Sequence, residues 1–274
     1  MEVHVLASGS DGNCTVIEND GEAIMIDAGI SCRRIMTLMD RQGIDKEMLK
    51  AILITHEHSD HVSGAGATAR KLDIPVVANE ATFNASNLGS VQHWMYKSNA
   101  YIDIGQFHVT PLATSHNAVE PNCYFTEVDN DKKVLVATDT GKFSAQIEYA
   151  LGLADVAVIE ANYDIDMLIN GPYPPSLKSL IGSERGHMNN VDTARAIRRT
   201  MGKNENRQIF LAHLSKTNNT PDTARQAVSD VSGIKRIKID CLEFPGDTRT
   251  LKLKGRSRRP SDCSREWRPS LWGG

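Results

Sequence analysis

The sequence predicts an α/β fold, and three observations support this prediction. Short apolar segments rich in β-branched residues alternate with segments of helical pattern along most of the chain. Several apolar segments are followed closely by aspartate or histidine, which places polar groups at the ends of buried strands. With 274 residues and an ordinary composition, the chain is long enough to bury a sizeable core. We therefore expect a globular domain that carries a site at the ends of its strands.

The composition excludes several classes of protein. No run of eighteen apolar residues exists, so the sequence predicts no membrane span. Residues 1–6 indicate a strand and lack the features of a secretory signal. The five cysteines are scattered and odd in number, which favours reduced thiols and a cytoplasmic location. The formal net charge is −3, so any contact with nucleic acid must come from a local basic patch. The sequence does not specify an oligomeric state.

The first part of the chain predicts four strands and one helix. The strands cover residues 3–7, 15–18, 23–26 and 51–54. The glycine-rich turn at residues 8–13 can expose backbone N–H groups to an anion or serve only as a turn, and Asn19-Asp20-Gly21 is a strong hairpin signal. Ser31 is the expected N-cap of a helix over Cys32–Gln42, which ends at Gly43.

The chain is organised around a histidine cluster at residues 55–61, Thr-His-Glu-His-Ser-Asp-His. The cluster follows an apolar strand and precedes a helix of small residues, so it lies on a strand-to-helix turn. Neutral imidazole and carboxylate suit a divalent ion such as zinc. His56 and His58 can face one point, because they are two residues apart in an extended loop, while Asp60 and His61 can face a second point. Asp27, at the end of the preceding strand, can orient a ligand from behind.

The rest of the chain continues the alternation of strands and helices. Strands are predicted over residues 76–78, 107–113, 123–127, 133–137, 155–159, 209–211 and 234–239, and helices over 68–72, 143–151, 191–201 and from Pro221 onward. Residues 79–100 predict a helix and a loop, and residues 170–187 predict an ordered loop because they contain several prolines and glycines. His116, Asp139 and His213 each follow a strand. His187 lies just before a helix N-terminus, where an anion is favoured.

The last residues differ from the rest in character. From residue 253 to 274 the chain is basic, contains serine and proline, and includes Trp267 and Trp272. This composition predicts a disordered tail, with contact to nucleic acid as an alternative role. We therefore expect one globular domain over residues 1–252, followed by the tail.

The order of the chemical groups resembles that of the metallo-β-lactamase superfamily. An aspartate after a strand, the His-x-His-x-Asp-His cluster, and then a histidine, an aspartate and a histidine at later strand ends recur in that order. The resemblance implies a single-domain αββα sandwich, and the chain leaves no room for an inserted β-CASP domain. It also implies a set of metal ligands. His56, His58 and His116 would bind one metal ion, Asp60, His61 and His213 would bind the other, and Asp139 would bridge them.

More specific motifs resemble the YycJ/WalJ group of this superfamily, over residues 1 to about 250. They include Ser-Gly-Ser at 8–10, Gly186-His187, and His-Leu-Ser-Lys at 213–216 with an asparagine pair close behind. The group is associated with metal-dependent 5′-to-3′ DNA exonuclease activity, so the resemblance implies a DNA substrate. The implied substrate contacts are Ser8, Asn13, Lys216, Asn218 and Asn219. Glu160 and His187 resemble paired elements of RNase Z-type phosphodiesterases, in which a histidine supported by a carboxylate assists the leaving oxygen.

The leading hypothesis is a phosphodiesterase with two divalent ions, zinc or manganese, in which metal-bound hydroxide attacks phosphorus. Its candidate catalytic residues are Asp60, His187 and Glu160. A phosphodiesterase for small substrates such as cyclic nucleotides is the first alternative, and the acidic pI near 6.3 fits it. A thioester or lactone hydrolase is a second alternative, but the pair of His187 and Glu160 argues against it. A non-catalytic metal-binding module is a third, although the complete ligand set argues against it.

Overall fold

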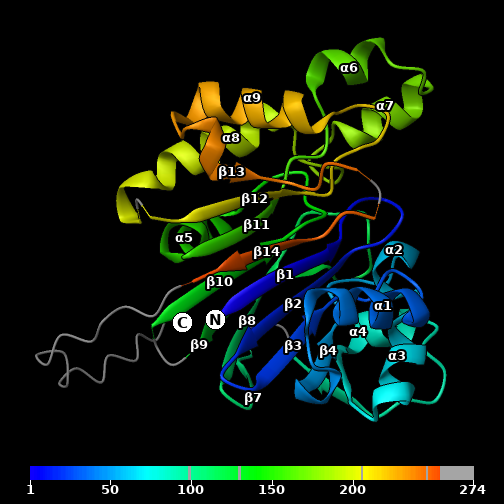
Figure 1. Cartoon of the computed structure of the whole chain (residues 1–274). Coiled ribbons are helices and arrows are strands. Elements are labelled where there is room, and N and C mark those ends of the chain that lie inside the picture. The colour runs from blue at the N-terminus through cyan, green and yellow to red at the C-terminus, as the bar shows by residue number, and fades with distance from the viewer. Residues whose placement is uncertain (98–99, 129–130, 205, 245, 254–274) are drawn as a thin grey trace, which may run out of the picture.

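The computed structural model describes residues 1–253 except 98–99, 129–130, 205 and 245. Two seven-stranded sheets pack face to face, and helices cover both outer faces (Figure 1). This αββα sandwich, in one domain, confirms the predicted fold class. No helix in the described ranges is both long and apolar enough to cross a membrane. Of the predicted tail, residues 254–274 lie outside the described residues.

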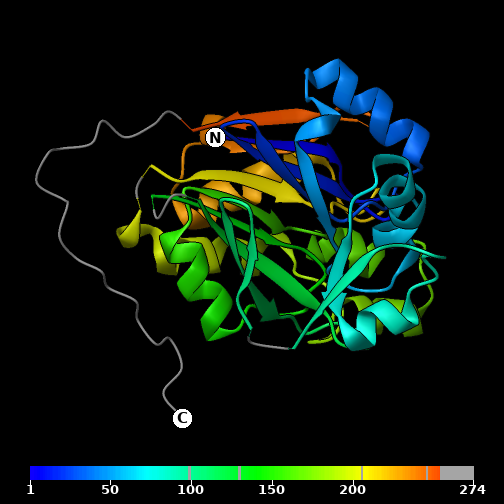
Figure 2. The same ribbon diagram turned by 90° about the horizontal axis from the view of Figure 1, so that it is seen from below.

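The first sheet comes mainly from the N-terminal half, in the order β14-β1-β2-β3-β4-β5-β6. Its strands are β14 Arg249–Lys252, β1 Glu2–Ala7, β2 Cys14–Asn19, β3 Glu22–Ile26, β4 Leu49–Leu53, β5 Val76–Asn79 and β6 His93–Tyr96. The hairpin between β2 and β3 is confirmed, with Asp20 and Gly21 at positive φ in its turn. The late strand β14 pairs with β1, and Figure 2 shows the two side by side.

The second sheet has the order β13-β12-β11-β10-β9-β8-β7. Its strands are β13 Ile239–Asp240, β12 Gln208–Ala212, β11 Val156–Glu160, β10 Lys132–Ala137, β9 Asn122–Val128, β8 Phe107–Ala113 and β7 Ile102–Ile104. The strand predicted over residues 234–239 is wrong, because Arg236–Lys238 form a short 3-10 helix and only two residues pair with β12. Ile237 is 92% exposed, whereas Ile239 is buried in the core beside the second sheet, so the run does not alternate as a strand with one buried face would.

Helices pack on the two outer faces of the sandwich (Figure 1). Those beside the first sheet are α1 Cys32–Gln42, α2 Ser59–Val62, α3 Ala65–Leu72 and α4 Glu80–Ala85, with a short 3-10 helix at Lys46–Met48. Those beside the second are α5 Ala145–Leu153, α8 Asn190–Thr200 and α9 Pro221–Ser232, with a 3-10 helix at Met201–Lys203. The helix α1 is confirmed with its predicted cap, since Ser31 Oγ accepts from Arg34 N and Gly43 is left-handed.

Two segments differ from the predicted loops. Residues 170–187 contain α7 Pro175–Ile181, and α6 Ile165–Asn170 precedes it. The prolines begin this helix rather than prevent it, because Pro175 occupies the first turn, where no N–H bond is lost. Residues 79–100 contain the unpredicted strand β6, three of whose four residues are exposed, so it shows no apolar alternation.

The pairing directions place the functional residues at one edge. The strands β3 and β4 are parallel, and so are β10, β11 and β12. Both β8 and β10 run antiparallel to β9, so they point the same way. The space between the sheets is filled by apolar side chains such as Ile24, Phe107, Tyr124 and Phe210, which fix the two sheets against each other. Within each sheet, the strands that precede site residues therefore end on the same side.

Candidate metal centre and active site

Three residues at the strand ends adopt a left-handed backbone. Asp27 follows β3 with φ 58°, Asp139 follows β10 with φ 57°, and His213 follows β12 with φ 55°. Aspartate and histidine tolerate this region better than bulky residues do, but it still costs roughly 1–2 kcal/mol each. Such conformations concentrate at functional sites, where surrounding structure holds them in place. The three strands therefore turn sharply at the points where the chemistry lies.

The first group of ligating side chains consists of His56, His58 and His116, whose candidate ligand atoms lie within 4.8 Å of one another. His56 Nε2 lies 3.1 Å from His58 Nδ1. His116 comes from the loop after β8 and donates its Nδ1–H to the carbonyl of Gly186 at 3.0 Å. This bond leaves Nε2 of His116 free to bind a cation, as expected for a metal-ligating histidine.

The second group consists of Asp60, His61, Asp139 and His213, also within 4.8 Å. Asp60 Oδ2 lies 3.4 Å from His61 Nε2 and 3.3 Å from His213 Nε2. Asp139 Oδ2 lies 3.1 Å from His61 Nε2, while its Oδ1 lies 3.5 Å from His213 Nε2 and 3.8 Å from His116 Nε2. Asp139 is thus a carboxylate placed between histidines of both groups.

A hydrogen-bond network behind the histidine loop orients it. Asp27 accepts from Thr55 Oγ1–H at 2.9 Å and from His61 Nδ1–H at 2.7 Å. Because the Thr55 hydroxyl donates to Asp27, it accepts from His56 Nδ1–H at 3.0 Å. Both imidazoles therefore keep Nε2 for the centre of the site, and Asp27 holds the two rings from behind. Asp27 is 2% exposed.

The electrostatics separate the two groups. Burial, with the charge of His61, holds the pKa of His56 well below its usual value, and burial lowers that of His116. Burial opposes charge on His61, but the nearby carboxylates of Asp27 and Asp139 outweigh it and raise the pKa of His61. Burial opposes charge on His213 as well, but Asp139 and Asp60 outweigh it and raise the pKa of His213 to about 10. The carboxylates of the second group therefore favour positive charge at this point.

The residues present fit divalent metal ions. Within the described residues, Asp139 Oδ2 is buried and accepts no hydrogen bond, which is costly unless a cation satisfies it. Two imidazole nitrogens that face each other at 3.1 Å share at most one proton, so they too suit a cation. Histidine with aspartate is a donor set typical of zinc and also acceptable to manganese.

His187 and Glu160 form a pair beside these groups. His187 Nδ1–H donates to Glu160 Oε1 at 2.6 Å, and the ring stacks on His213 at 5.2 Å between centroids. Glu160, at the end of β11, is fully buried, and its Oε2 accepts from Thr140 N at 2.9 Å. Burial opposes charge on His187, but Glu160 outweighs it and raises the pKa of His187. The His187 side chain is 20% exposed, so it reaches the surface of the site.

The predicted substrate contacts lie in two loops that meet over His213. Ser8 Oγ accepts from His213 N at 2.7 Å, and Asn13 Nδ2 lies 3.1 Å from His61 Nε2. Lys216 is exposed and forms an ion pair with Asp11. Asn218 is fully buried, and its side-chain amide has no hydrogen-bond partner within the described part of the chain. Asn219 is 4% exposed and donates to the carbonyls of residues 161 and 162, so its contacts are internal.

Sequence reasoning gave no role to several supporting residues. Thr55 connects Asp27 to His56, and Asn162 donates to the His213 carbonyl at 2.8 Å and lies 3.1 Å from His213 Nδ1. Gly186 supplies the carbonyl for His116. The available signals were weak, because a threonine or asparagine after a buried strand is common in turns.

The fold and this pair of ligand groups define a metallohydrolase of the αββα type. The Metallo-beta-lactamase superfamily model matches residues 7–213, so the chain belongs to that superfamily and is an enzyme of the hydrolase class. The chain is 38% identical over 236 residues to Exodeoxyribonuclease YycJ of Bacillus anthracis, covering 84% of this chain and 89% of that protein. It is also 38% identical to Exodeoxyribonuclease WalJ of Streptococcus pneumoniae D39 over 231 residues, covering 82% and 85%.

Solved structures confirm the fold. The metallo-beta-lactamase fold protein YhfI from Bacillus subtilis superposes with a TM-score of 0.69 at 16% identity, covering 91% of this chain and 99% of that chain. The predicted resemblance to the YycJ/WalJ group is thus confirmed by sequence, and the predicted fold by structure.

Proposed function

We propose that the enzyme is a two-metal phosphodiesterase that degrades DNA from a 5′ end. The observation that carries the proposal is the His187–Glu160 pair beside Asp139. A phosphodiester needs a proton for its leaving oxygen, whereas hydrolysis of a thioester or lactone does not require this extra acid. The relatives named as exodeoxyribonucleases support DNA as the substrate.

Seven residues would hold the metal ions. His56, His58 and His116 would hold one, Asp60, His61 and His213 would hold the other, and Asp139 would be shared. When bound, two divalent ions would lower the pKa of a water molecule and stabilise charge on the phosphoryl oxygens. Asp60 has a second function, because it also sits between His61 and His213 and keeps both rings directed at the centre.

The role of His187 follows from its hydrogen bond. Since Nδ1–H donates to Glu160, Nε2 is the nitrogen available to a substrate. A proton on Nε2 would pass to the oxygen that leaves phosphorus. Glu160 is buried and also held by the Thr140 backbone, so it acts through His187 and does not touch substrate. Ser8, Asn13, Lys216, Asn218 and Asn219 would order the two loops over the site, where Lys216 is the exposed cation.

The test compares two substrates in the presence of Mn²⁺ or Zn²⁺: a 5′-phosphorylated duplex oligonucleotide and a 3′,5′-cyclic nucleotide. We expect stepwise release of mononucleotides from the 5′ end of the duplex, followed with separate 5′ and 3′ labels. His187→Ala should lower this rate by about 10²–10⁴-fold without changing metal content. His108→Ala is the matched control, because His108 is an exposed residue of β8 that pairs with the exposed Asp103 of β7 at 2.6 Å, away from the site.

Other outcomes would redirect the proposal. Opening of the cyclic nucleotide with an intact duplex would indicate a small-substrate phosphodiesterase. Release from the 3′ end would reverse the direction but keep the chemistry. If neither substrate is turned over, thioesters and lactones should be tested next, and metal binding without turnover of any ester would indicate a non-catalytic module.

A further inference from the structure

The charge of the chain is divided along its length. Residues 1–194 contain 13 lysines and arginines against 26 acidic residues, whereas residues 195–253 contain 12 against 6 and residues 254–274 contain 6 against 2. The net charge of −3 therefore conceals an acidic part and a basic part. In the fold, the elements of the basic part gather along one flank of the sandwich, as the yellow-to-red segments in Figure 1 show. A polyanion would approach this flank in preference to the acidic remainder.

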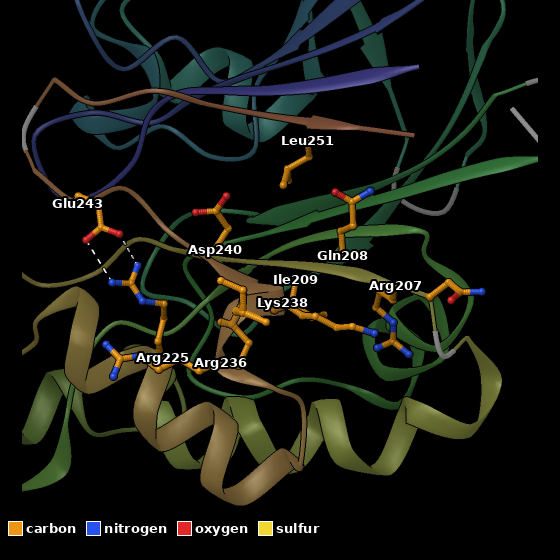
Figure 3. A pocket seen from close by; sticks show the side chains of 12 residues that line it. Arg207, Gln208, Ile209, Arg225, Arg236, Lys238, Asp240, Glu243 and Leu251 are labelled. Atoms are coloured by element: carbon orange, nitrogen blue, oxygen red, sulfur yellow. Dashed lines mark hydrogen bonds and ion pairs between the residues drawn. The ribbon is translucent and has the colours of Figure 1, made fainter. Parts of the chain in front are cut away.

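This flank contains a cavity of about 870 Å³ between α9 and the strands β12, β13 and β14 (Figure 3). The charged residues that line it are Arg207, Arg225, Arg236, Lys238, Asp240 and Glu243. Four of these are basic and two are acidic, so the wall carries a positive excess. The cavity lies at the edge of the sandwich, where β14 ends the first sheet and β13 ends the second.

Two of the cations have no acidic partner among the described residues. Arg207 is 7% exposed and bonds only to Thr200, through the hydroxyl and the carbonyl at 2.9 Å each, and its Nε has no partner in the described ranges. Burial lowers the pKa of Arg207 to about 10, so it is still charged at neutral pH. Lys238 forms no ion pair in the described structure. Arg225 and Arg236 are instead held by Glu243 and Asp222.

The cavity lies along the strand that leads to the metal centre. Gln208 lines the cavity at the start of β12, and His213 follows the end of the same strand. At about 3.3 Å per residue, the strand separates the two by roughly 17 Å. A strand of duplex DNA covers that distance in about five nucleotides, at 3.4 Å each.

We infer that this basic flank binds the phosphate backbone of the DNA substrate beyond the terminus held at the metal centre, with the exposed Arg236 and Lys238 as contacts and Arg207 as a buried charge behind them. The inference rests on the proposed function for the identity of the polyanion. Phosphate contacts of this kind position a strand without reading its sequence. The flank would therefore favour long duplexes over short oligonucleotides of any sequence.

The test uses the metal-loaded full chain and a 5′-phosphorylated 24-base-pair duplex with phosphorothioate linkages that resist cleavage. Its affinity is measured by fluorescence anisotropy between 50 and 200 mM KCl, beside that of a 5′-phosphorylated tetranucleotide. The variant is Arg236→Gln with Lys238→Gln, since both side chains are exposed and the Arg236 surface ion pair contributes little to stability. The control is Lys46→Gln with Lys71→Gln, which removes the same charge from exposed positions in the acidic part.

Loss of two phosphate contacts should make the slope of log affinity against log salt shallower by about 1.8 for the duplex. The ratio of duplex to tetranucleotide affinity should fall in the same variant, and the control should match the wild type in both. Equal slopes and ratios in all three proteins would overturn the inference. If the wild type binds the duplex with the steeper salt dependence but hydrolyses no DNA, the proposed function is refuted and the binding inference is not. The two failures can therefore be told apart.

Discussion

The two halves of the metal centre are built in different ways. The first sheet supplies four candidate ligands from one segment after β4, at residues 56, 58, 60 and 61. The second sheet supplies three from the ends of three strands, at residues 116, 139 and 213. The first half depends on local spacing, while the second depends on how β8, β10 and β12 are arranged in the sheet. One half of the centre is therefore encoded in a short motif and the other in the topology.

The support behind the two halves differs as well. In the first half, Asp27 and Thr55 form one network that holds both His56 and His61. In the second half, each histidine has its own partner: a backbone carbonyl for His116, and Asn162 with Glu160 for His213. A substitution in the Asp27–Thr55 network should thus affect several candidate ligands, whereas a substitution of a supporting residue in the second half should affect one.

The largest effect is expected from Asp139→Asn, because Asp139 joins the two halves. The substitution keeps the shape but removes the charge that faces His61, His213 and His116. We expect hydrolysis below detection and a fall in metal content from two ions per chain, with an unchanged circular dichroism spectrum. Asp73→Asn is the matched control, since Asp73 has φ 53° at the end of α3 and lies outside the site. If the Asp139→Asn enzyme kept full activity and full metal content, the Asp139 carboxylate would not be the group that connects the two halves.

The next effect in size is expected from Asp27→Asn. The carboxylate accepts from Thr55 N at Oδ1 and from His61 Nδ1 at Oδ2, whereas an amide has only one oxygen and would turn its NH₂ group toward one of these two donors. Metal affinity should fall by about 10–100-fold, measured by competition with a chelator. Because His61 is a member of the second ligand group, the ion held there should be lost first. Loss of both ions in parallel would contradict the distinction between the groups, and an unchanged affinity would show that the Asp27 network does not tune them.

The first half of the site was easier to predict from the sequence than the second, because local spacing defines the first and the topology of the sheet defines the second. The spacing within residues 55–61 places a local cluster without knowledge of the fold. His116, Asp139 and His213 are scattered over about a hundred residues, and their meeting could be inferred only from the resemblance to a superfamily. Supporting contacts such as that of Asn162 with His213 were not predictable, because they depend on which distant segments pack together. The same limit explains why β14 was missed: its register against β1 joins residues about 250 apart.

A smaller effect tests how closely the histidine loop is packed. A Cβ on Gly29 would lie 1.6 Å from the carbonyl oxygen of Asp60, so the loop approaches the chain after β3 at a point where only glycine fits. Gly29→Ala should lower the free energy of unfolding by about 1–3 kcal/mol and shift the Asp60 backbone, which reduces metal affinity without removing a ligand. Gly202→Ala is the control, because a Cβ there meets nothing within 4 Å. Unchanged stability and metal affinity would show that the loop can move to accommodate the added methyl group.

The smallest effect concerns the first sheet away from its metal loop, where β1 pairs with β14. His4 is 2% exposed, its Nδ1 contacts Thr250 Oγ1 at 2.9 Å, and its Nε2 lies 3.4 Å from Glu18. Burial lowers the pKa of His4, and the raising effects of Glu18 and Glu2 do not fully offset it. The folded state therefore binds fewer protons at His4 than the unfolded state, whose pKa is about 6.5.

Stability from this group is thus fully present above pH 6.5 and falls as the pH drops through that value toward the lower folded pKa. Metal ligands also titrate in acid, so the measurement is a difference: the unfolding free energies of wild type and His4→Gln are compared at pH 7.5 and pH 5.5. We expect the wild type to lose more than the variant, on the order of 1 kcal/mol. A larger loss in His4→Gln would mean that Glu18 and Glu2 outweigh burial, and that the junction of β1 with β14 carries a charged histidine.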